Sequence, residues 1–399
     1  MIVLLAPESR LVSGGYLYNR HIADSLPEEQ FKYLRLPMEP PAPEALHRFG
    51  VASDAHLLLD SLYFTHPRWV ESLASWHNGP VSMLVHYLPS LEPLLPPNIA
   101  KTKRRAEAAC LACCRRAVVP SGYLKSEIQR LHRAPPTITV APPGIAATPE
   151  PGNSSYVKQP AVQLLTVANW TASKNHRFLL PVLAELSNLP WEWNIYGNMD
   201  ETGALVQEFR STAHSLRIDS RIHISPQLPP KEVIDKMHRA DLFIYPSLFE
   251  SYGMVIAEAL VAGLPIVANR IGGIPEVVGA TPVSNESPAV PKDSTVPAGK
   301  SKGGAAAAVL CNFDAPRGSQ EQWQAALARL IQDPQGRQNL GAAALERARV
   351  LPSWRKTADT ILSHLEPEIA SKVEIYKFLQ RNCCEFSICK SFDFQIENR

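Results

Sequence analysis

Several features that mark other protein classes are scarce or missing in this sequence of 399 residues. No apolar run approaches the roughly 18 residues that a membrane-spanning helix needs, so we expect a soluble chain. Lys and Arg number 40 against 38 Asp and Glu, and the net charge of +2 gives no general field for nucleic acid or an anionic membrane. The apolar start at residues 1–6 lacks a basic lead and is followed by Pro7 and Glu8, which favours a buried strand over a signal peptide.

Signs of metal, cofactor and disulfide chemistry are also weak. The seven cysteines are an odd number, and six of them cluster at Cys110–Cys114 and Cys383–Cys389, which is no disulfide framework and favours a reducing cytoplasm. Cys110 and Cys113 have the spacing of a zinc ligand pair, but no second pair of ligands matches it. We therefore expect these cysteines to be small buried residues. No Asp-x-Asp motif, which would bind a divalent cation, stands at the end of a predicted strand. No Gly-x-Gly-x-x-Gly motif follows a predicted strand either, which argues against a nicotinamide dehydrogenase. We therefore expect no metal and no cofactor.

Short apolar runs alternate with helical patterns, which predicts an α/β fold of parallel sheets covered by helices on both faces. The predicted strands are Ile2–Ala6, His56–Asp60, Val81–His86, Ala117–Pro120 and Ile138–Ala141, then Gln163–Ala168, Trp191–Tyr196, Ile222–Ser225, Leu242–Tyr245 and Pro265–Ala268. The predicted helices include Tyr16–Leu26, Pro67–Trp76, Ala100–Arg115, Asn175–Leu186, Pro230–Arg239 and Gly253–Val261.

The chain is long enough for two domains that face each other across a cleft. We predict Rossmann-like, doubly wound domains at residues 1–145 and 161–368. A Pro- and Gly-rich linker at 146–160 separates them. The segment 281–304 has too little apolar surface to order itself and is predicted to be a flexible insert, and the tail 369–399 has no clear period.

The most informative segment follows the predicted strand Leu242–Tyr245. Its loop carries Glu250, and a helix begins at Gly253 and ends at Gly263, where glycine suits a left-handed cap. The start of this helix faces the carboxyl ends of the strands, where N–H groups and the helix dipole favour an anion such as a diphosphate. Glu258, in the second turn, is expected to accept hydrogen bonds from neutral hydroxyls such as those of a ribose, with Glu250 on the sugar side.

These residues resemble the retaining GT-B glycosyltransferases of the large family four, whose signature is two glutamates separated by seven residues, here Glu250 and Glu258. The resemblance extends over most of the chain. It takes in Ser13-Gly14-Gly15, His86, Val119-Pro120-Ser121, Pro143-Gly144, Lys174, Asp241, Pro246-Ser247, Gly272-Gly273-Ile274-Pro275-Glu276 and Trp354.

The resemblance implies a GT-B fold and a metal-independent, retaining, hexosyl-type transfer from a nucleoside diphosphate sugar to a hydroxyl acceptor. It assigns the acceptor to residues 1–145 and the donor to residues 161–368. It implies that Gly14 and Gly15 approach the phosphates, which a missing Cβ permits. It also implies that His86 touches the donor sugar or the reacting centre and that Lys174 neutralises the leaving diphosphate. With Glu250 these two form the expected catalytic set. The expected donor-binding set is Gly14, Gly15, Asn169, Ser251, Tyr252, Gly253, Met254 and Glu258.

One position departs from the family. The family usually has an arginine five residues before the lysine, whereas this sequence has Asn169 there. Either another basic side chain such as Arg177 or Arg270 reaches the site, or the departing diphosphate is stabilised less than in other members of the family. The departure keeps open an alternative function, a sugar-nucleotide-binding partner subunit without turnover.

Two interpretations of the basic run Lys101–Arg105 stay open as well. Lys101–Arg105 can contact an anionic membrane peripherally if the acceptor is a lipid, or form an ordinary solvated helix face. The base and sugar of the donor and the identity of the acceptor are not encoded in any motif that we recognise.

Overall fold

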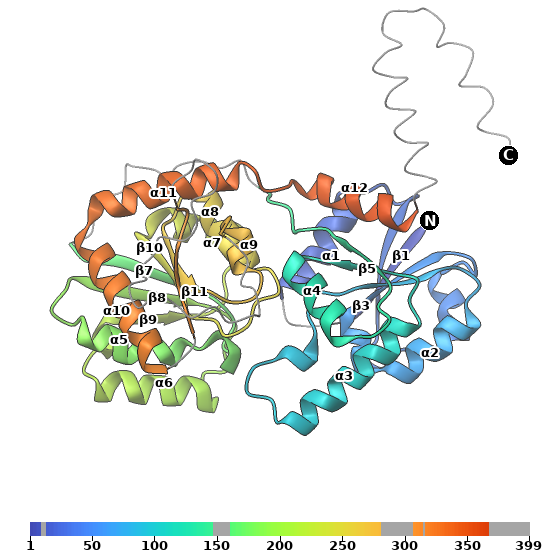
Figure 1. Cartoon of the computed structure of the whole chain (residues 1–399), viewed down its shortest axis with the longest axis horizontal. Coiled ribbons are helices and arrows are strands. Elements are labelled where there is room, and N and C mark those ends of the chain that lie inside the picture. Colours follow the sequence, from blue (N-terminus) through green and yellow to red (C-terminus); the bar gives the residue numbers. More distant parts are fainter. Residues whose placement is uncertain (9–12, 147–159, 281–305, 314–315, 367–399) are drawn as a thin grey trace, which may run out of the picture.

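A computed structural model describes the chain in five stretches, residues 1–8, 13–146, 160–280, 306–313 and 316–366. Two α/β units lie side by side, each built on its own sheet (Figure 1). The predicted insert and tail, and the predicted linker apart from its end residues, lie outside the described residues.

The first unit is a six-stranded parallel sheet with the order β2-β1-β3-β4-β5-β6. Its strands are β1 (Ile2–Pro7), β2 (Phe31–Leu36), β3 (His56–Asp60), β4 (Val81–Leu84), β5 (Arg116–Val119) and β6 (Thr137–Val140). Its helices are α1 (Gly14–Asp24), α2 (Pro67–Trp76), α3 (Pro97–Ala112) and α4 (Gly122–Leu131). The sequence analysis missed β2, because this edge strand is only partly buried and Lys32 and Arg35 interrupt its apolar run.

The second unit is also a six-stranded parallel sheet, with the order β12-β11-β10-β7-β8-β9. Its strands are β7 (Val162–Val167), β8 (Trp191–Tyr196), β9 (Ile222–Ser225), β10 (Leu242–Tyr245), β11 (Ile266–Asn269) and β12 (Val309–Cys311). Its helices are α5 (Leu179–Glu185), α6 (Ala204–Ser215), α7 (Pro230–Arg239), α8 (Met254–Val261), α9 (Ile274–Val277), α10 (Pro316–Gln332) and α11 (Pro334–Ala348).

The predicted α/β class is confirmed, with two differences in the second unit. The three-residue strand β12 was missed because it is too short to give a pattern. The helix predicted from Asn175 begins only at Leu179, because Asn175 has a positive φ of 54° between two short 3₁₀ turns.

The strand order of the second sheet determines where a ligand can bind. Strands β7 and β10 are neighbours, although β8 and β9 lie between them in the sequence. The connections after β7 and β10 therefore leave the sheet in opposite directions, and a crevice opens at their carboxyl ends.

The last described helix, α12 (Trp354–Leu365), returns to the first unit (Figure 1). Its apolar face packs with Ile2, Leu4 and Tyr18 in one core cluster. The domain predicted as 161–368 therefore differs from the structure at its end, because the amphipathic face of α12 is buried against the first sheet. Within the described residues, no helix is both long and apolar enough to span a bilayer.

Candidate active site

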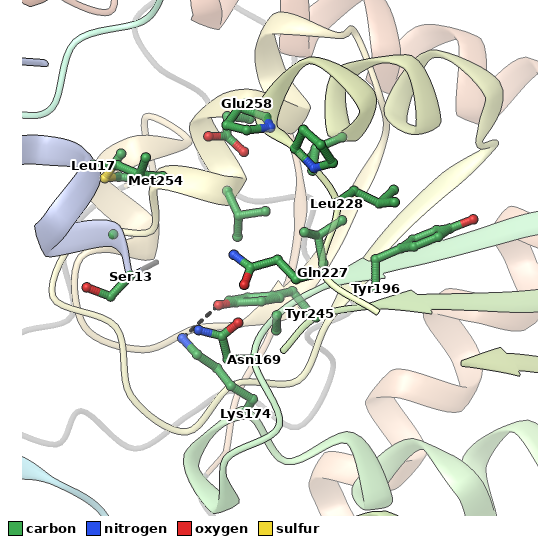
Figure 2. Close-up of a pocket in the computed structure, with 18 of the residues that line it drawn as sticks. Ser13, Leu17, Asn169, Lys174, Tyr196, Gln227, Leu228, Tyr245, Met254 and Glu258 are labelled. Carbon is green, nitrogen blue, oxygen red and sulfur yellow. Dashed lines mark hydrogen bonds between the residues drawn. The ribbon is translucent and has the colours of Figure 1, made fainter. Parts of the chain in front are cut away.

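A cavity of about 490 Å³ lies at the carboxyl ends of the second sheet, beside the start of α1 (Figure 2). The first unit contributes Ser13, Gly14 and Leu17. The second unit contributes Val167, Ala168, Asn169, Lys174, Tyr196, Gly197, Gln227, Leu228, Pro229, Pro230, Val233, Tyr245, Glu250, Met254, Val255 and Glu258. The cavity is thus formed mainly by the second unit and closed on one side by the first.

Helix α8 begins at this cavity. Gly253 precedes it with a φ of 102°, a conformation that favours glycine, and no side chain caps the helix start. Met254 and Val255, in its first turn, line the cavity. The predicted left-handed glycine after the helix is confirmed, since Gly263 has a φ of 64°. The uncapped N-terminus leaves N–H groups and a positive dipole end beside the cavity, which suits an anion.

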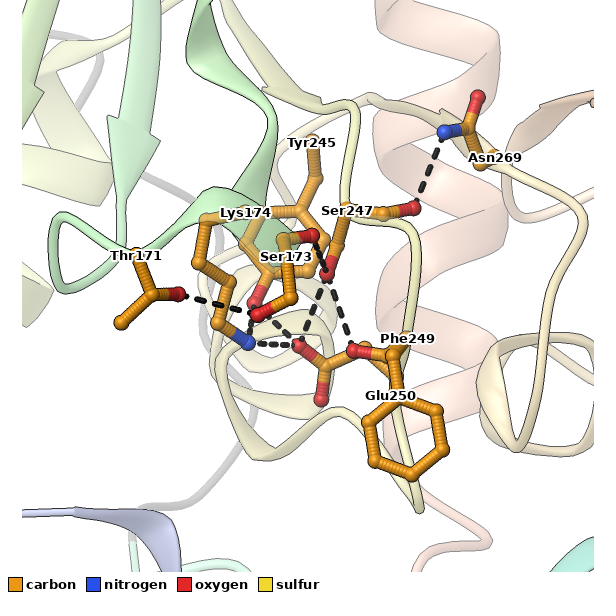
Figure 3. Close-up of polar contacts among 8 residues, drawn as sticks. All are labelled: Thr171, Ser173, Lys174, Tyr245, Ser247, Phe249, Glu250 and Asn269. Carbon is orange, nitrogen blue, oxygen red and sulfur yellow. Dashed lines mark hydrogen bonds and ion pairs between the residues drawn. The ribbon is translucent and has the colours of Figure 1, made fainter. Parts of the chain in front are cut away.

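Lys174, Tyr245 and Glu250 form a hydrogen-bonded cluster in the cavity wall (Figure 3). The Lys174 ammonium donates to the Glu250 carboxylate and, at 2.9 Å, to the Tyr245 hydroxyl. The Tyr245 hydroxyl donates to the same carboxylate oxygen at 2.5 Å. Burial alone would lower the pKa of Lys174, but Glu250 and Tyr245 outweigh it and raise the pKa. Lys174 is therefore cationic across the physiological range.

A buried amide fixes the loop that carries Glu250. The Asn269 side chain donates to the carbonyl oxygens of Pro246 at 2.9 Å and Ser247 at 3.0 Å, and accepts from the Trp323 indole at 2.8 Å. Asn269 is fully buried, so this set of bonds would be costly to break. Sequence analysis did not identify Asn269, because a single amide at a strand end carries no signal.

The Gly272-Gly273 pair supports the same loop from the other side. A Cβ on Gly272 would lie 1.9 Å from the Glu250 carbonyl oxygen, and the Gly273 N–H donates to that oxygen at 3.0 Å. A side chain at either glycine would push the loop away. The two glycines thus set the backbone position of Glu250.

Glu258 projects toward the cavity from the second turn of α8 (Figure 2). Its side chain is partly buried, and burial alone raises its pKa to about 7. No described residue forms a hydrogen bond or ion pair with it. A carboxylate in this state is available to accept hydrogen bonds from a ligand.

His86 lies in the first unit, after β4, and does not line this cavity. Its Nε2 is 2.9 Å from Asn19 Oδ1 and 3.3 Å from Asp60 Oδ2. Both partners are acceptors, since the Asn19 amide nitrogen itself donates to Asp60 at 2.6 Å. Nε2 therefore carries a proton. Burial would raise the pKa of Asp60, but His86 holds it below its usual value.

Gly15 stands against this histidine. A Cβ on Gly15 would lie 3.0 Å from the His86 ring, whereas a Cβ on Gly14 would lie 3.5 Å from the Met254 sulfur across the cavity. The absence of a side chain at Gly15 thus has an explanation within the protein, namely room for the His86 ring.

The cavity brings together part of the predicted set. Of the predicted residues, Gly14, Asn169, Lys174, Glu250, Met254 and Glu258 line it, whereas Gly15, His86, Ser251, Tyr252 and Gly253 do not. Tyr252 is buried in the core of the second unit, and the Ser251 carbonyl accepts a hydrogen bond from Ser121. Tyr196 and Tyr245 were missed, although each ends a predicted strand and could have been identified by that position.

The proposed substitutes for the missing arginine do not reach the cavity. Arg177 forms an exposed ion pair with Glu208, and Arg270 is not among the lining residues. Lys174 is therefore the only cationic side chain among the described residues that line the cavity. The Asn169 Oδ1 accepts from the Asn198 N–H at 3.1 Å, which ties its amide to the cavity wall.

Comparisons with known proteins agree with this architecture. Residues 154–283 match the profile of the family described as Glycosyl transferases group 1. A D-inositol 3-phosphate glycosyltransferase of Corynebacterium glutamicum is 28% identical over 178 residues, which are 45% of this chain and 36% of the relative. The chain thus aligns with about a third of the length of that relative.

Solved structures are similar over nearly the whole chain. The sucrose-phosphate synthase of Thermosynechococcus elongatus superposes with a TM-score of 0.69 at 15% identity, covering 95% of this chain and 99% of that one. Anabaena HepE in complex with UDP and glucose gives a TM-score of 0.66 at 15% identity, covering 94% and 99%. The predicted GT-B fold and the resemblance to GT-B glycosyltransferases are confirmed.

Proposed function

We propose that this chain is a retaining, metal-independent glycosyltransferase that moves a hexose-type sugar from a nucleoside diphosphate donor to a hydroxyl acceptor. The observation that carries the proposal is the convergence of Lys174, the uncapped start of α8 and the unpartnered Glu258 on one cavity. A cation and a helix N-terminus match a diphosphate, and a carboxylate matches vicinal hydroxyls. The similarity to HepE, whose structure contains UDP and glucose, supports a nucleotide-sugar donor.

We propose one orientation of the donor in the cavity. The diphosphate lies at the start of α8 near Lys174, and the ribose hydroxyls donate to Glu258 one turn further along the helix. The base then lies beside Gln227 and Leu228, which offer an amide and an apolar side chain. The sugar points toward Glu250 and the first unit.

Negative charge grows on the diphosphate as the bond to the sugar breaks. Lys174 and the α8 dipole are already oriented in the cavity wall, so they stabilise this charge without reorganising. The Glu250 carboxylate lies beside Lys174 and orients the sugar as its anomeric carbon becomes oxocarbenium-like. The acceptor hydroxyl attacks from the face that the diphosphate leaves, which retains the configuration.

The protein groups supply the charge that a divalent cation supplies elsewhere. Among the described residues there is no group of three or more His, Cys, Asp or Glu side chains placed to hold a metal ion. We expect turnover to survive EDTA. Loss of turnover on chelation, restored by Mg²⁺ or Mn²⁺, would contradict the proposal.

The first unit forms the acceptor side. The Nε2–H of His86 is held by Asn19 and Asp60, and no described residue forms a hydrogen bond with Nδ1, so Nδ1 is the ring atom that would meet a substrate. We propose that His86 faces the sugar and the acceptor hydroxyl. A His86→Ala variant should then lose turnover while binding UDP normally.

We also propose that the first unit contacts an anionic membrane when the acceptor is a lipid. Leu94 and Ile99 are 78% and 42% exposed, and Lys101, Arg104 and Arg105 are exposed nearby on α3. Exposed apolar and basic side chains together favour an interfacial position. Co-sedimentation with phosphatidylglycerol vesicles but not phosphatidylcholine vesicles, lost when the three basic residues become glutamine, would support this contact.

A panel of nucleotide sugars tests the central proposal. A donor present at 100 times its Kd should stabilise the protein by about 2.7 kcal/mol, which a thermal-shift screen detects. Slow release of free sugar without an acceptor should follow for the same donor, and NMR of the product with an acceptor gives its anomeric configuration. Tight binding with no release of sugar would favour the alternative function, a partner subunit without turnover, for which Asn169 is the motivating residue.

A further inference from the structure

The start of α4, in the first unit, is bound by a carboxylate of the second. The Glu276 side chain, from α9, accepts from the Gly122 N–H at 2.8 and 3.1 Å and from the Tyr123 N–H at 3.4 Å. A carboxylate at a helix N-terminus satisfies free donors and meets the positive end of the dipole. The two units are thus joined by a charged contact outside the cavity.

A second contact lies beside the first. The Ser121 hydroxyl, which caps α4 by accepting from the Leu124 N–H at 3.1 Å, also donates to the Ser251 carbonyl oxygen at 2.5 Å. Ser251 directly follows Glu250. One hydroxyl therefore orders the start of α4 and joins it to the loop of the catalytic carboxylate.

Glu276 is connected to the same loop through its own helix. Gly273, which precedes α9, donates its N–H to the Glu250 carbonyl oxygen at 3.0 Å. At the other end of α9, Arg347 donates to the carbonyl oxygens of Glu276 at 2.8 Å and Val277 at 2.7 Å. Helix α9 and the Glu250 loop are therefore held as one body.

We propose that Glu276 and Ser121 form an interdomain latch that sets the first unit, with His86, against the Glu250 loop. The inference rests on the proposed function, in which His86 and Glu250 act on one sugar from different units. Both latch residues are positioning residues, since neither lines the cavity. Their polar groups can be hydrated when the units separate, so the contact suits repeated opening and closing.

Opening the latch should affect donor binding and sugar transfer unequally. The second unit supplies all but three of the residues around the cavity, so UDP should bind whether or not the latch is closed. Transfer requires both units together. Opening the latch should therefore lower kcat and leave the Kd for UDP within about twofold.

The test compares Glu276→Gln, Ser121→Ala and the double variant with a matched control, Glu346→Gln. Glu346 is an exposed carboxylate of the second unit that pairs with Arg349. Three measurements are made on each protein: amide exchange at Gly122 and Tyr123, UDP binding by calorimetry, and hydrolysis of UDP-glucose. Small-angle scattering reports whether the units separate.

Each single latch variant should exchange these amides at least about fivefold faster and lose about fivefold or more in kcat. That is the size expected when a charge at a helix end (Glu276→Gln) or an N-cap hydroxyl (Ser121→Ala) is removed. The double variant should lose less than the sum of the single losses in free energy, because both contacts hold one interface. Ser121→Thr should restore activity by keeping the hydroxyl. Glu346→Gln should match the wild type.

Unchanged exchange and unchanged scattering in the double variant would overturn the latch. Parallel losses in kcat and UDP affinity would overturn the positioning role and indicate a general structural one. Failure of the proposed function looks different, because the wild type would then hydrolyse no member of the nucleotide-sugar panel, UDP-glucose included. Exchange and scattering would still decide whether the latch holds the units together.

Discussion

Replacing Glu258 by glutamine should stabilise the protein at alkaline pH while it weakens binding of the donor. Glu258 is partly buried at the cavity and has no partner among the described residues. Its ionised form is therefore poorly solvated in the empty protein. Glutamine has nearly the same shape and no charge, so the variant removes only the cost of that ionisation.

The size of the effect follows from the pKa of Glu258, which burial raises from an ordinary 4.5 to about 7. A tenfold change in an ionisation constant is equivalent to 1.36 kcal/mol, so the full cost is about 3 kcal/mol. Water in the cavity solvates part of this side chain and reduces the cost. We expect the Glu258→Gln protein to gain ~1–3 kcal/mol in free energy of unfolding at pH 8.

The pH dependence has a definite sign. Below pH 4.5 the carboxyl is protonated in both the folded and the unfolded chain, and it costs nothing. Between pH 4.5 and about 7 the unfolded chain loses the proton first, so wild-type stability falls as pH rises. The advantage of the variant should accordingly be small at pH 5 and complete at pH 8.

Binding of the donor should have the opposite effect and favour the ionised form of Glu258. In the proposed function, ribose hydroxyls donate to Glu258 and stabilise its ionised form, so UDP binding near pH 7 should release a fraction of a proton. Calorimetry of UDP binding in buffers of different ionisation enthalpy measures this release. Glu258→Gln should abolish it and raise the donor KM with little change in kcat.

Urea denaturation of the wild type, Glu258→Gln and Glu185→Gln at pH 5 and pH 8 provides the stability assay. Glu185 is an exposed carboxylate on α5, and its replacement should change little at either pH. Equal stability of the wild type and the Glu258 variant at pH 8, or an advantage as large at pH 5, would refute the reasoning. Proton release that persists in the variant would show that another group titrates.

Three further substitutions test the site and the fold. Lys174→Ala should lower kcat by about 10²- to 10³-fold and weaken UDP binding far less, because its charge matters most as the diphosphate departs; equal losses in the two constants, in steady-state kinetics and calorimetry, would contradict that role. Asn169→Arg should raise kcat or tighten UDP, because no second cationic side chain among the described residues lines the cavity, and an unchanged or weaker site would show that one charge suffices. Gly144→Ala should lower the melting temperature by several degrees, because its Cβ would lie 2.2 Å from the Trp354 backbone nitrogen. An unchanged melting temperature in scanning calorimetry would mean that α12 moves aside easily.

The local sequence determined most of the elements and indicated the candidate site. Buried parallel strands such as Leu242–Tyr245 are short continuous apolar runs, and Gly263 marks the end of α8 because its left-handed conformation suits glycine. The spacing of Glu250 and Glu258 around a helix start could be seen without coordinates. These features depend on neighbours in the chain, so the sequence carries them directly.

The tertiary structure decided which groups meet. The Lys174–Glu250 pair, the support from Asn269 and the contact of Glu276 with Gly122 each join residues far apart in the sequence. The return of α12 to the first unit depends on which apolar face remains uncovered. No local pattern encodes such contacts, because they arise only when the two sheets have formed and their loops compete for the same space.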